Sequence, residues 1–377
     1  MKRMVIKIFG AVLFGFVSIS LFLGCQEEPD SPSPAPKDQL NHDIYVSFYY
    51  EDLKNGGGNR VAAYWHNDSI VTLSDNSVDA YANGIFVDGE DVYVVGSSGG
   101  AAVYWKNGVE RVLPQGAIAS SIYIRDGKVY ICGCNNSSVG SIVPMCWIDE
   151  SPIVLKGGMC ANSIFVDEED SIHIAGYGKS QYSDDIIYYW EGLESDIADN
   201  YSVIGGTKMK DQNNSTSAYG ISATADGSSV IVCGVETDNA AKKFIAKQWI
   251  NRRGHSLTVG ENGTEARAVF VEKDEFYVAG KMARTACYWQ CKVKSDKMTV
   301  DKSTKKINEL TSGKTDTYAT SIFVKDGSVY VVGYEAGTAI NKPLLWRGKQ
   351  SLKFLDSEKM NLDVTTTGLY VKDRAEK

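Results

Sequence analysis

Histidine is scarce in this chain of 377 residues, which has only four: His42, His66, His173 and His255. Their separations do not fit the short ligand spacings of zinc sites, so the histidines predict no metal and no cofactor. The chain also lacks an excess of positive charge, because 47 acidic residues outnumber 39 Lys and Arg residues and give a net charge of -8. Nucleic acids are bound through basic surfaces, and we therefore expect no nucleic-acid partner.

Proline is also infrequent, and four of the 8 prolines lie between residues 29 and 36. This Pro-rich, acidic segment, residues 25–43, is predicted to be an extended tether. It follows residues 1–24, which have a basic start and an apolar run from Ile8 to Leu23. The run is shorter than the roughly 20 residues of a membrane-spanning helix, and the pattern is typical of a secretory signal.

The predicted signal ends in FLGC, which resembles a bacterial lipobox, although Phe22 stands where Leu is usual. The resemblance implies that Cys25 becomes the lipidated first residue of the mature protein and anchors it to a membrane. The acidic residues after Cys25 resemble the export signal of Bacteroidetes surface lipoproteins. That second resemblance implies a location on the outer face of the outer membrane.

Six units of similar sequence make up most of the remaining chain, and they recur at intervals of 37 to 57 residues. Each begins with Ala and passes through a first hydrophobic run, a turn such as Asp88-Gly89, and a second run such as VYVVG at 92–96. The runs are rich in Val, Ile, Tyr and Phe and are bounded by Gly and Asp, which predicts β-hairpins. The units begin at Ala82, Ala119, Ala161, Ala218, Ala266 and Ala319.

A third run in each unit is built around tryptophan, and the chain contains 7 Trp residues. The first, Trp65, lies in an N-terminal segment that matches the second to fourth strands of a unit but has no first strand before it. The segment TTGLYVKD, Thr366 to Asp373, supplies that missing strand. We therefore predict an all-β fold over residues 44–373, a seven-bladed β-propeller of four-stranded blades closed by the C-terminal strand joining the N-terminal blade, with residues 374–377 as a tail.

The recurring pattern resembles the NHL, YVTN and kelch-like propeller repeats. The segments YVVG at 93–96 and 330–333 and YWKNG at 104–108 also resemble lipoprotein propellers of gut Bacteroidetes. These resemblances imply the propeller fold over residues 44–373. They leave the activity open, because propellers host enzymes and pure binding proteins alike.

Local motifs predict no catalytic residue. The segment GSSGG, Gly96 to Gly100, matches the nucleophile elbow of hydrolases, but that motif requires a following helix and a third strand is expected here. His173 occupies the place of Tyr93 and Tyr130 in other units, so we expect a packing role for it. Carboxylate pairs drawn from different blades would leave no local spacing, and a carbohydrate-active hydrolase or lyase therefore stays open as the alternative function.

Seven cysteines follow Cys25, and this odd number argues against a complete disulfide framework. Cys132 and Cys233 replace Val or Ala of other units, which predicts small core residues. Cys134, Cys146 and Cys160 are less constrained by the repeat. A single local disulfide or a zinc site among these three is an open alternative.

One rim of the predicted propeller combines the starts of the first strands with the loops after the second strands, around the central channel. The strand starts vary between units: Asn83, Ser120, Asn162, Tyr219, Arg267, Thr320 and Thr367. The loops add Tyr49, Tyr50, Tyr177, Tyr182, Arg284 and Tyr334. Tyrosines among short polar side chains suit a sugar, because C–H faces stack on rings while hydroxyl groups form hydrogen bonds.

From this rim we predict a binding or scaffold module for a glycan or a protein partner. The predicted ligand-binding residues are Tyr49, Tyr177, Tyr219, Arg267, Arg284 and Tyr334.

Lipidation can be tested on protein purified from its native membranes. We expect mass spectrometry to find Cys25 as the first residue, carrying several acyl chains, because a single chain gives only marginal membrane binding. A Cys25→Ala variant should carry no lipid. A mature N-terminus at any residue other than Cys25 contradicts the prediction.

Overall fold

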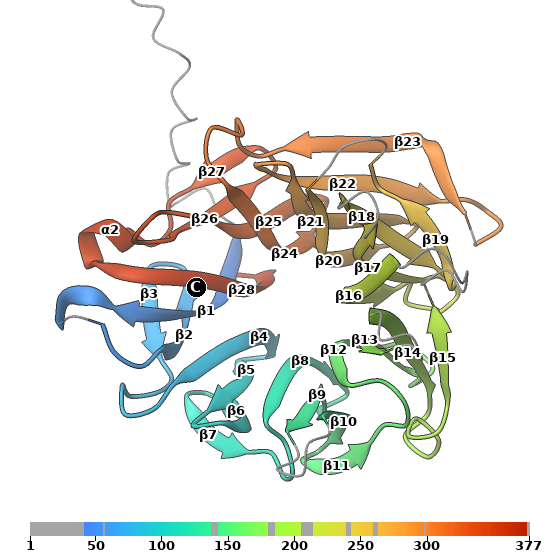
Figure 1. Cartoon of the computed structure of the whole chain (residues 1–377), viewed down its shortest axis with the longest axis horizontal. Coiled ribbons are helices and arrows are strands. Elements are labelled where there is room, and N and C mark those ends of the chain that lie inside the picture. The colour runs from blue at the N-terminus through green and yellow to red at the C-terminus, as the bar shows by residue number, and fades with distance from the viewer. Residues whose placement is uncertain are drawn as a thin grey trace, which may run out of the picture. The chain divides into compact units, whose positions relative to one another are not determined.

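Seven four-stranded antiparallel sheets follow one another around a ring (Figure 1). The computed structural model describes residues 41–55, 57–136, 142–179, 185–204, 214–238, 243–258, 263–297 and 299–374. The predicted signal, Cys25, nearly all of the tether and Tyr182 lie outside the described residues. The predicted fold class, an all-β propeller of seven blades, is confirmed.

The blades are numbered here in chain order, with the blade that joins both ends of the domain as blade 7. The strands are, for blade 1, β4 (Ala80–Asp88), β5 (Asp91–Ser98), β6 (Ala101–Lys106) and β7 (Val109–Val112); for blade 2, β8 (Ile118–Arg125), β9 (Lys128–Asn136), β10 (Ile142–Ile148) and β11 (Ser151–Val154); for blade 3, β12 (Cys160–Val166), β13 (Ile172–Lys179), β14 (Asp185–Gly192) and β15 (Tyr201–Ile204); for blade 4, β16 (Asn214–Ala223), β17 (Val230–Asp238), β18 (Lys243–Ile250) and β19 (Arg253–Ser256); for blade 5, β20 (Thr264–Glu272), β21 (Glu275–Met282), β22 (Thr285–Val293) and β23 (Val300–Glu309); for blade 6, β24 (Thr317–Lys325), β25 (Ser328–Glu335), β26 (Lys342–Arg347) and β27 (Gln350–Leu352); and for blade 7, β28 (Leu362–Asp373), β1 (His42–Asp52), β2 (Val61–His66) and β3 (Ser69–Thr72).

The first strand of each blade is its innermost strand, and the seven inner strands contact one another in sequence around the centre. Side chains on these strands also link neighbouring blades. The Ser121 hydroxyl accepts a hydrogen bond from the Ile164 N–H at 3.4 Å, and the Ser163 hydroxyl accepts one from the Ile221 N–H at 3.1 Å. These bonds hold β8, β12 and β16 side by side at the channel.

The core lies between adjacent blades, where the tryptophans pack. Trp105 of blade 1 belongs to one buried cluster with Tyr45 and Ala62 of blade 7, and Trp65 of blade 7 belongs to another with Tyr330 and Val332 of blade 6. Each blade therefore buries both faces, which is the arrangement that leaves no apolar sheet face in water. The described cysteines are free and buried within these layers.

Blade 7 joins the two ends of the domain. β28 pairs with β1 along its whole length, from His42 opposite Asp373 to Asp52 opposite Leu362. The predicted closure by the C-terminal strand is thus confirmed. Two short helical segments, η2 (Leu53–Asn55) and α2 (Ser357–Met360), lie outside the sheets, and in the part of the chain that the structure describes no helix is long and apolar enough to cross a membrane.

Removing most of β28 should destabilise the whole ring. A chain ending at Leu362 loses the buried side chains of Val364, Leu369 and Val371. At about 1.5 to 3 kcal/mol for each aliphatic side chain, the loss is about 4 to 9 kcal/mol, comparable with the total stability of a typical domain. We expect a much lower thermal midpoint, or no cooperative unfolding, by circular dichroism.

The matched control is a chain ending at Arg374, which keeps all of β28. It should melt like the full chain. If the chain ending at Leu362 melts at the same temperature as this control, then β28 does not stabilise the ring by the expected amount.

Candidate functional site

Each of the seven inner strands carries a β-bulge at the same position. In β20, for example, Ala266 pairs with Gly280 and Ala268 pairs with Ala279, so Arg267 is the extra residue without a partner on β21. A bulge re-aims its side chain out of the regular alternation of a strand. The bulge residues are Asn83, Ser120, Asn162, Tyr219, Arg267, Thr320 and Thr367.

A glycine within the second strand permits this geometry in blades 1 to 6. A Cβ atom on Gly280 would lie 1.9 Å from the carbonyl oxygen of Glu265 and 3.1 Å from the Cα atom of Ala266. The equivalent glycines of the other five blades would clash with a backbone carbonyl in the same way. The recurring Ala and Gly of the sequence repeat are therefore the two sides of one close backbone contact.

The seven bulge residues line one pocket at the centre of the ring, with a volume of about 190 Å³. We call it the channel pocket. The two residues that follow the bulge residue complete the lining in five blades, for example Gly84 and Ile85 after Asn83, and in blades 3 and 4 only the next residue, Ser163 or Gly220, does so. The strand-start residues that the sequence placed on one rim are thus brought together.

Several bulge side chains are held by hydrogen bonds within the ring. The Asn83 amide donates to the Ala119 carbonyl of blade 2 at 2.9 Å, and the Asn162 amide donates to the Ala218 carbonyl of blade 4 at 2.7 Å. Thr367 donates to the Ser47 carbonyl of its own blade at 3.0 Å. These contacts fix the polar groups in place and reduce the entropy lost when a ligand binds.

Tyr219 and Arg267 form the charged and aromatic side of the channel pocket. The Arg267 guanidinium lies 5.0 Å from the centre of the Tyr219 ring, and its Nε atom donates to Glu265 Oε2 at 2.9 Å. Burial opposes the charge of Arg267, but Glu265 and Tyr219 outweigh it and raise the Arg267 pKa above its ordinary value. Burial raises the pKa of Tyr219 as well. Arg267 therefore stays a cation and Tyr219 a neutral phenol.

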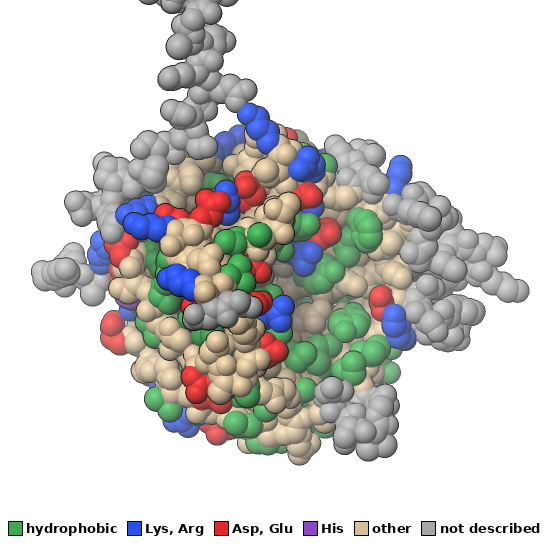
Figure 2. Space-filling view, turned by 60° about the vertical axis from the view of Figure 1, so that its left-hand side comes forward, with side chains coloured by type: hydrophobic (Ala, Val, Ile, Leu, Met, Phe, Trp, Pro, Cys, Tyr) green, Lys and Arg blue, Asp and Glu red, His purple; other side chains and the backbone are tan. Residues whose placement is uncertain are grey.

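Further tyrosines lie on the same rim. Tyr334 stacks on Tyr318 with ring centres 5.1 Å apart, and Tyr49 meets the edge of Tyr81 at 5.0 Å. Burial raises the pKa of Tyr177. The space-filling view shows a hollowed surface on which green hydrophobic side chains, a class that includes tyrosine, lie among blue and red charged groups (Figure 2).

Two of these tyrosines were missed from the sequence. Tyr81 and Tyr318 each stand directly before the recurring Ala that begins a unit, at Ala82 and Ala319. An alignment of the units on that Ala would have shown a second variable position next to the bulge residue. Tyr318 belongs to the rim because it pairs with Tyr334 across β24 and β25, and Tyr81 belongs to it because it contacts Tyr49.

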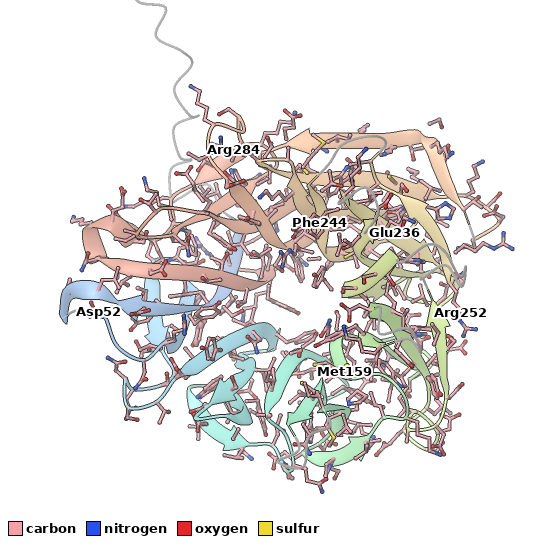
Figure 3. The ribbon with its side chains drawn as sticks, viewed as in Figure 1. Asp52, Met159, Glu236, Phe244, Arg252 and Arg284 are labelled. Carbon is pink, nitrogen blue, oxygen red and sulfur yellow. The ribbon has the colours of Figure 1, made fainter. Side chains whose placement is uncertain are left out.

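The structure separates the predicted site residues into three groups. Tyr219 and Arg267 line the channel pocket. Tyr49, Tyr177 and Tyr334 are in strands β1, β13 and β25 on the rim and are not among the residues that line the channel pocket. Arg284 lies in the turn between β21 and β22, where its carbonyl accepts a hydrogen bond from the Thr317 N–H of the inner strand β24 at 3.0 Å; the residue is exposed and is seen near the outer edge of the ring in Figure 3.

An aromatic layer lines the channel beyond the bulges. Ring centres of neighbouring blades lie 4.6 to 5.3 Å apart along a chain of six residues. In order around the ring these are Phe165, Tyr123, Phe86, Tyr370, Phe323 and Phe270. In β16 the equivalent residue is Ser222, so blade 4 interrupts the layer. In each inner strand the residue of this layer stands three positions after the bulge residue, as Phe86 does after Asn83, so the layer lies next to the channel pocket.

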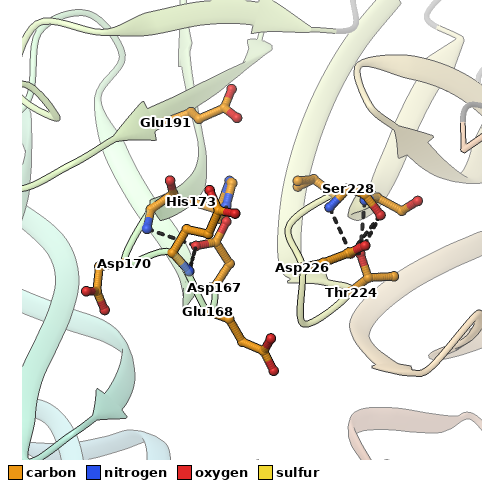
Figure 4. Close-up of polar contacts among 12 residues, drawn as sticks. Asp167, Glu168, Asp170, His173, Glu191, Thr224, Asp226 and Ser228 are labelled. Atoms are coloured by element: carbon orange, nitrogen blue, oxygen red, sulfur yellow. Dashed lines mark hydrogen bonds and ion pairs between the residues drawn. The ribbon is translucent and has the colours of Figure 1, made fainter.

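A second cavity, of about 330 Å³, lies between blades 3 and 4, with Tyr189, Glu191 and Arg252 in its lining. Beside it, His173 is buried and contacts the Tyr189 hydroxyl at 2.8 Å and Asp167 Oδ2 at 3.1 Å (Figure 4). Asp167 Oδ1 also accepts hydrogen bonds from the N–H groups of Glu169 and Ser171 at 2.9 Å. All polar atoms of His173 are used within the fold, in keeping with the packing role expected for it.

Comparisons with known proteins identify the fold and no family. No protein-family model and no curated protein matches the chain. Among solved structures, it is similar to an ulvan lyase of a polysaccharide lyase family, at 10% identity with a TM-score of 0.50, over 88% of this chain and 97% of that one. It is also similar to a protein from Lactobacillus plantarum, at 10% identity with a TM-score of 0.46, over 88% and 99%.

A third similar structure is a puromycin-hydrolyzing peptidase from Mycobacterium tuberculosis, at 10% identity with a TM-score of 0.49. The match covers 86% of this chain and about half, 53%, of the peptidase. At 10% identity the likeness to the ulvan lyase shows the fold alone, and the other two, with TM-scores of 0.46 and 0.49, carry no further argument.

The close Ala–Gly contact can be tested by Gly280→Ala. Because the added methyl group meets backbone atoms, which cannot rotate away, we expect a loss of about 3 kcal/mol or more in the free energy of unfolding, measured by urea denaturation. Gly127→Ala is the control. Gly127 has φ 75° and open space around its Cβ position, so only about 1 to 2 kcal/mol should be lost. Equal losses in the two variants contradict the assigned contact.

Proposed function

We propose that this propeller is a binding module that holds a glycan at the channel pocket and the surrounding tyrosine rim. The observation that carries the proposal is the convergence of the seven bulge residues on one pocket. Five of them present hydroxyl or amide groups, namely Asn83, Ser120, Asn162, Thr320 and Thr367. Such groups exchange hydrogen bonds with sugar hydroxyls, while the neighbouring tyrosine rings offer faces for stacking.

The size of the pocket indicates how such a ligand would sit. Its volume of about 190 Å³ is below the roughly 300 Å³ at which typical small-molecule sites begin. It accommodates one end or one residue of a longer ligand. Tyr177, Tyr334 and Tyr49 on the rim would then contact the following residues of the glycan.

The cellular setting is part of the same proposal. A lipid on Cys25 and the tether after it would present the propeller at the outer face of the outer membrane. The features that support this setting are the basic and apolar segment 1–24, the FLGC motif and the four prolines between residues 29 and 36. A protein partner in place of a glycan is the other outcome of the binding experiment below.

The alternative function, a carbohydrate-active hydrolase or lyase, has no specific support at the channel pocket. Among the described residues that line it there is no Asp, Glu or His. Glycoside hydrolysis ordinarily uses two carboxyl groups on either side of the bond that breaks. The nearest acid described above, Glu265, is already paired with Arg267.

Glycan binding is tested by screening the purified protein against a panel of neutral and acidic polysaccharides, followed by calorimetric titration of oligosaccharides from each hit. We expect Tyr219→Ala to weaken binding at least tenfold, about 1.4 kcal/mol, because it removes the ring in the pocket. Tyr177→Ala should weaken longer oligosaccharides more than short ones. Release of shortened products from the same panel would instead indicate an enzyme.

Tyr201→Ala is the matched control. Tyr201 is an exposed tyrosine of β15, an outermost strand, and its loss should leave binding unchanged. Undiminished binding in both Tyr219→Ala and Tyr177→Ala, or no binding anywhere in the panel, would overturn the proposal.

A further inference from the structure

Three metal-ligating side chains meet where the two ends of the domain join. His42 is at the start of β1, Asp373 is at the end of β28, and Asp326 is in the turn between β24 and β25. One ligand atom from each lies within 4.8 Å of the other two. We call these three residues the closure cluster. It lies in the joint between blades 6 and 7, and none of its members lines the channel pocket.

The spacing of the donor atoms fits a small divalent cation. His42 Nε2 is 3.2 Å from Asp326 Oδ2 and 3.8 Å from Asp373 Oδ1. Ligands arranged tetrahedrally at zinc distances of about 2.0 to 2.2 Å lie roughly 3.3 to 3.6 Å from one another. The two separations that involve His42 bracket that value, and all three donor atoms lie within 4.8 Å of one another, so side-chain rotations would bring them into the range of one cation.

The surrounding contacts orient each donor toward a common point. His42 is buried, and its Nδ1 atom is 2.8 Å from the Tyr330 hydroxyl, which is the kind of partner that holds the ring of a metal-bound histidine. Asp373 Oδ2 is 2.8 Å from Lys325 Nζ, which leaves Oδ1 turned toward His42. One nitrogen and two carboxylate oxygens therefore face one another.

The two carboxylates lie close to each other, since one oxygen of each is within 4.8 Å of the other and of a ring nitrogen of His42. Their side chains are 67% and 68% exposed, so water screens part of their repulsion, and Lys325 beside Asp373 offsets one charge. A divalent cation would offset the remainder. The buried histidine distinguishes the closure cluster from a group of exposed acids alone.

We propose that His42, Asp326 and Asp373 bind a divalent transition-metal cation, zinc or manganese, that fastens the closing blade to blade 6. One nitrogen and two oxygen ligands suit these borderline cations, and water completes the coordination. The ion links the first strand of the described domain, its last strand and the neighbouring blade. Its role is structural, because binding to the folded chain stabilises it.

The test uses the purified full chain, stripped with a chelator and titrated with zinc chloride and manganese chloride by calorimetry. We expect one bound cation per chain. At a free metal concentration of about 100 times Kd, the thermal midpoint should rise by roughly 2 to 6 °C. No binding of either cation, or binding without any rise in the midpoint, overturns the proposal.

Asp326→Asn removes a ligand and keeps the shape of the side chain. Asp326 has φ 49°, which Asn also tolerates, so the variant should fold normally. We expect its affinity for the cation to fall at least tenfold and the rise in the midpoint to disappear. His42→Gln should lose cation binding as well.

Asp126→Asn is the matched control. Asp126 occupies the same turn position between β8 and β9, with φ 50°, and its Oδ2 atom lies 3.6 Å from Arg125 Nε rather than beside a histidine. Its variant should bind the cation like the unchanged chain. Unchanged affinity in Asp326→Asn would place the cation elsewhere and overturn the assignment, as would equal losses in both variants.

Discussion

The close approach of two backbones inside each blade determines both the repeat and the site. Where the second strand carries Gly, the carbonyl before the recurring Ala can lie against it, as Glu265 does against Gly280. The residue after that Ala, Arg267 in this blade, then has no partner on the second strand, and it bulges toward the channel. The fold thus requires two small residues in each of blades 1 to 6 and leaves the bulge position free to vary. The channel pocket is therefore lined by seven side chains whose residue type the fold does not dictate.

Blade 7 satisfies the same geometry with different residues, because its first and second strands come from opposite ends of the domain. Thr366 pairs with Phe48 where other blades pair Ala with Gly, yet Thr367 still bulges. The Thr366 hydroxyl contacts the Thr320 hydroxyl of blade 6 at 3.0 Å, which ties the closing strand to its neighbour. In blade 7, side-chain hydrogen bonds replace part of the close Ala–Gly backbone contact of the other blades. The closure cluster lies at the C-terminal end of the same strand, β28, at Asp373.

Local periodicity was enough to predict the blades and a ring of variable strand-start residues from the sequence, but not that these residues are β-bulges. The recurring Ala, Gly and Trp mark equivalent positions, so each repeat could be aligned with the next and the varying position between Ala and Gly could be recognised. The position of each loop residue relative to the central channel could not be predicted in this way. Arg284 and Tyr334 both follow the Gly of a second hydrophobic run in the sequence, but only the register of the hairpins shows that Tyr334 lies within β25 beside Tyr318 while Arg284 lies in an exposed turn.

Contacts between distant parts of the chain were also beyond reach of the sequence. His42, Asp326 and Asp373 are separated by hundreds of residues or lie in different blades, so no spacing rule could group them. The aromatic layer was missed for a different reason. Phe86, Tyr123 and Phe165 look like ordinary core residues within a strand, and their common direction follows only from the ring closure that aligns all inner strands.

Blade 4 breaks the pseudo-symmetry of the channel, and this has a consequence for recognition. A pocket with seven equivalent sides would hold a ligand in seven equivalent orientations. In β16 the large ring is at the bulge, as Tyr219, and the small residue is in the deeper layer, as Ser222, the reverse of most blades. Arg267 of the next blade adds a fixed charge beside that ring. The side of the pocket formed by β16 and β20 is therefore chemically distinct from the other sides, which gives the proposed glycan one preferred place to stack.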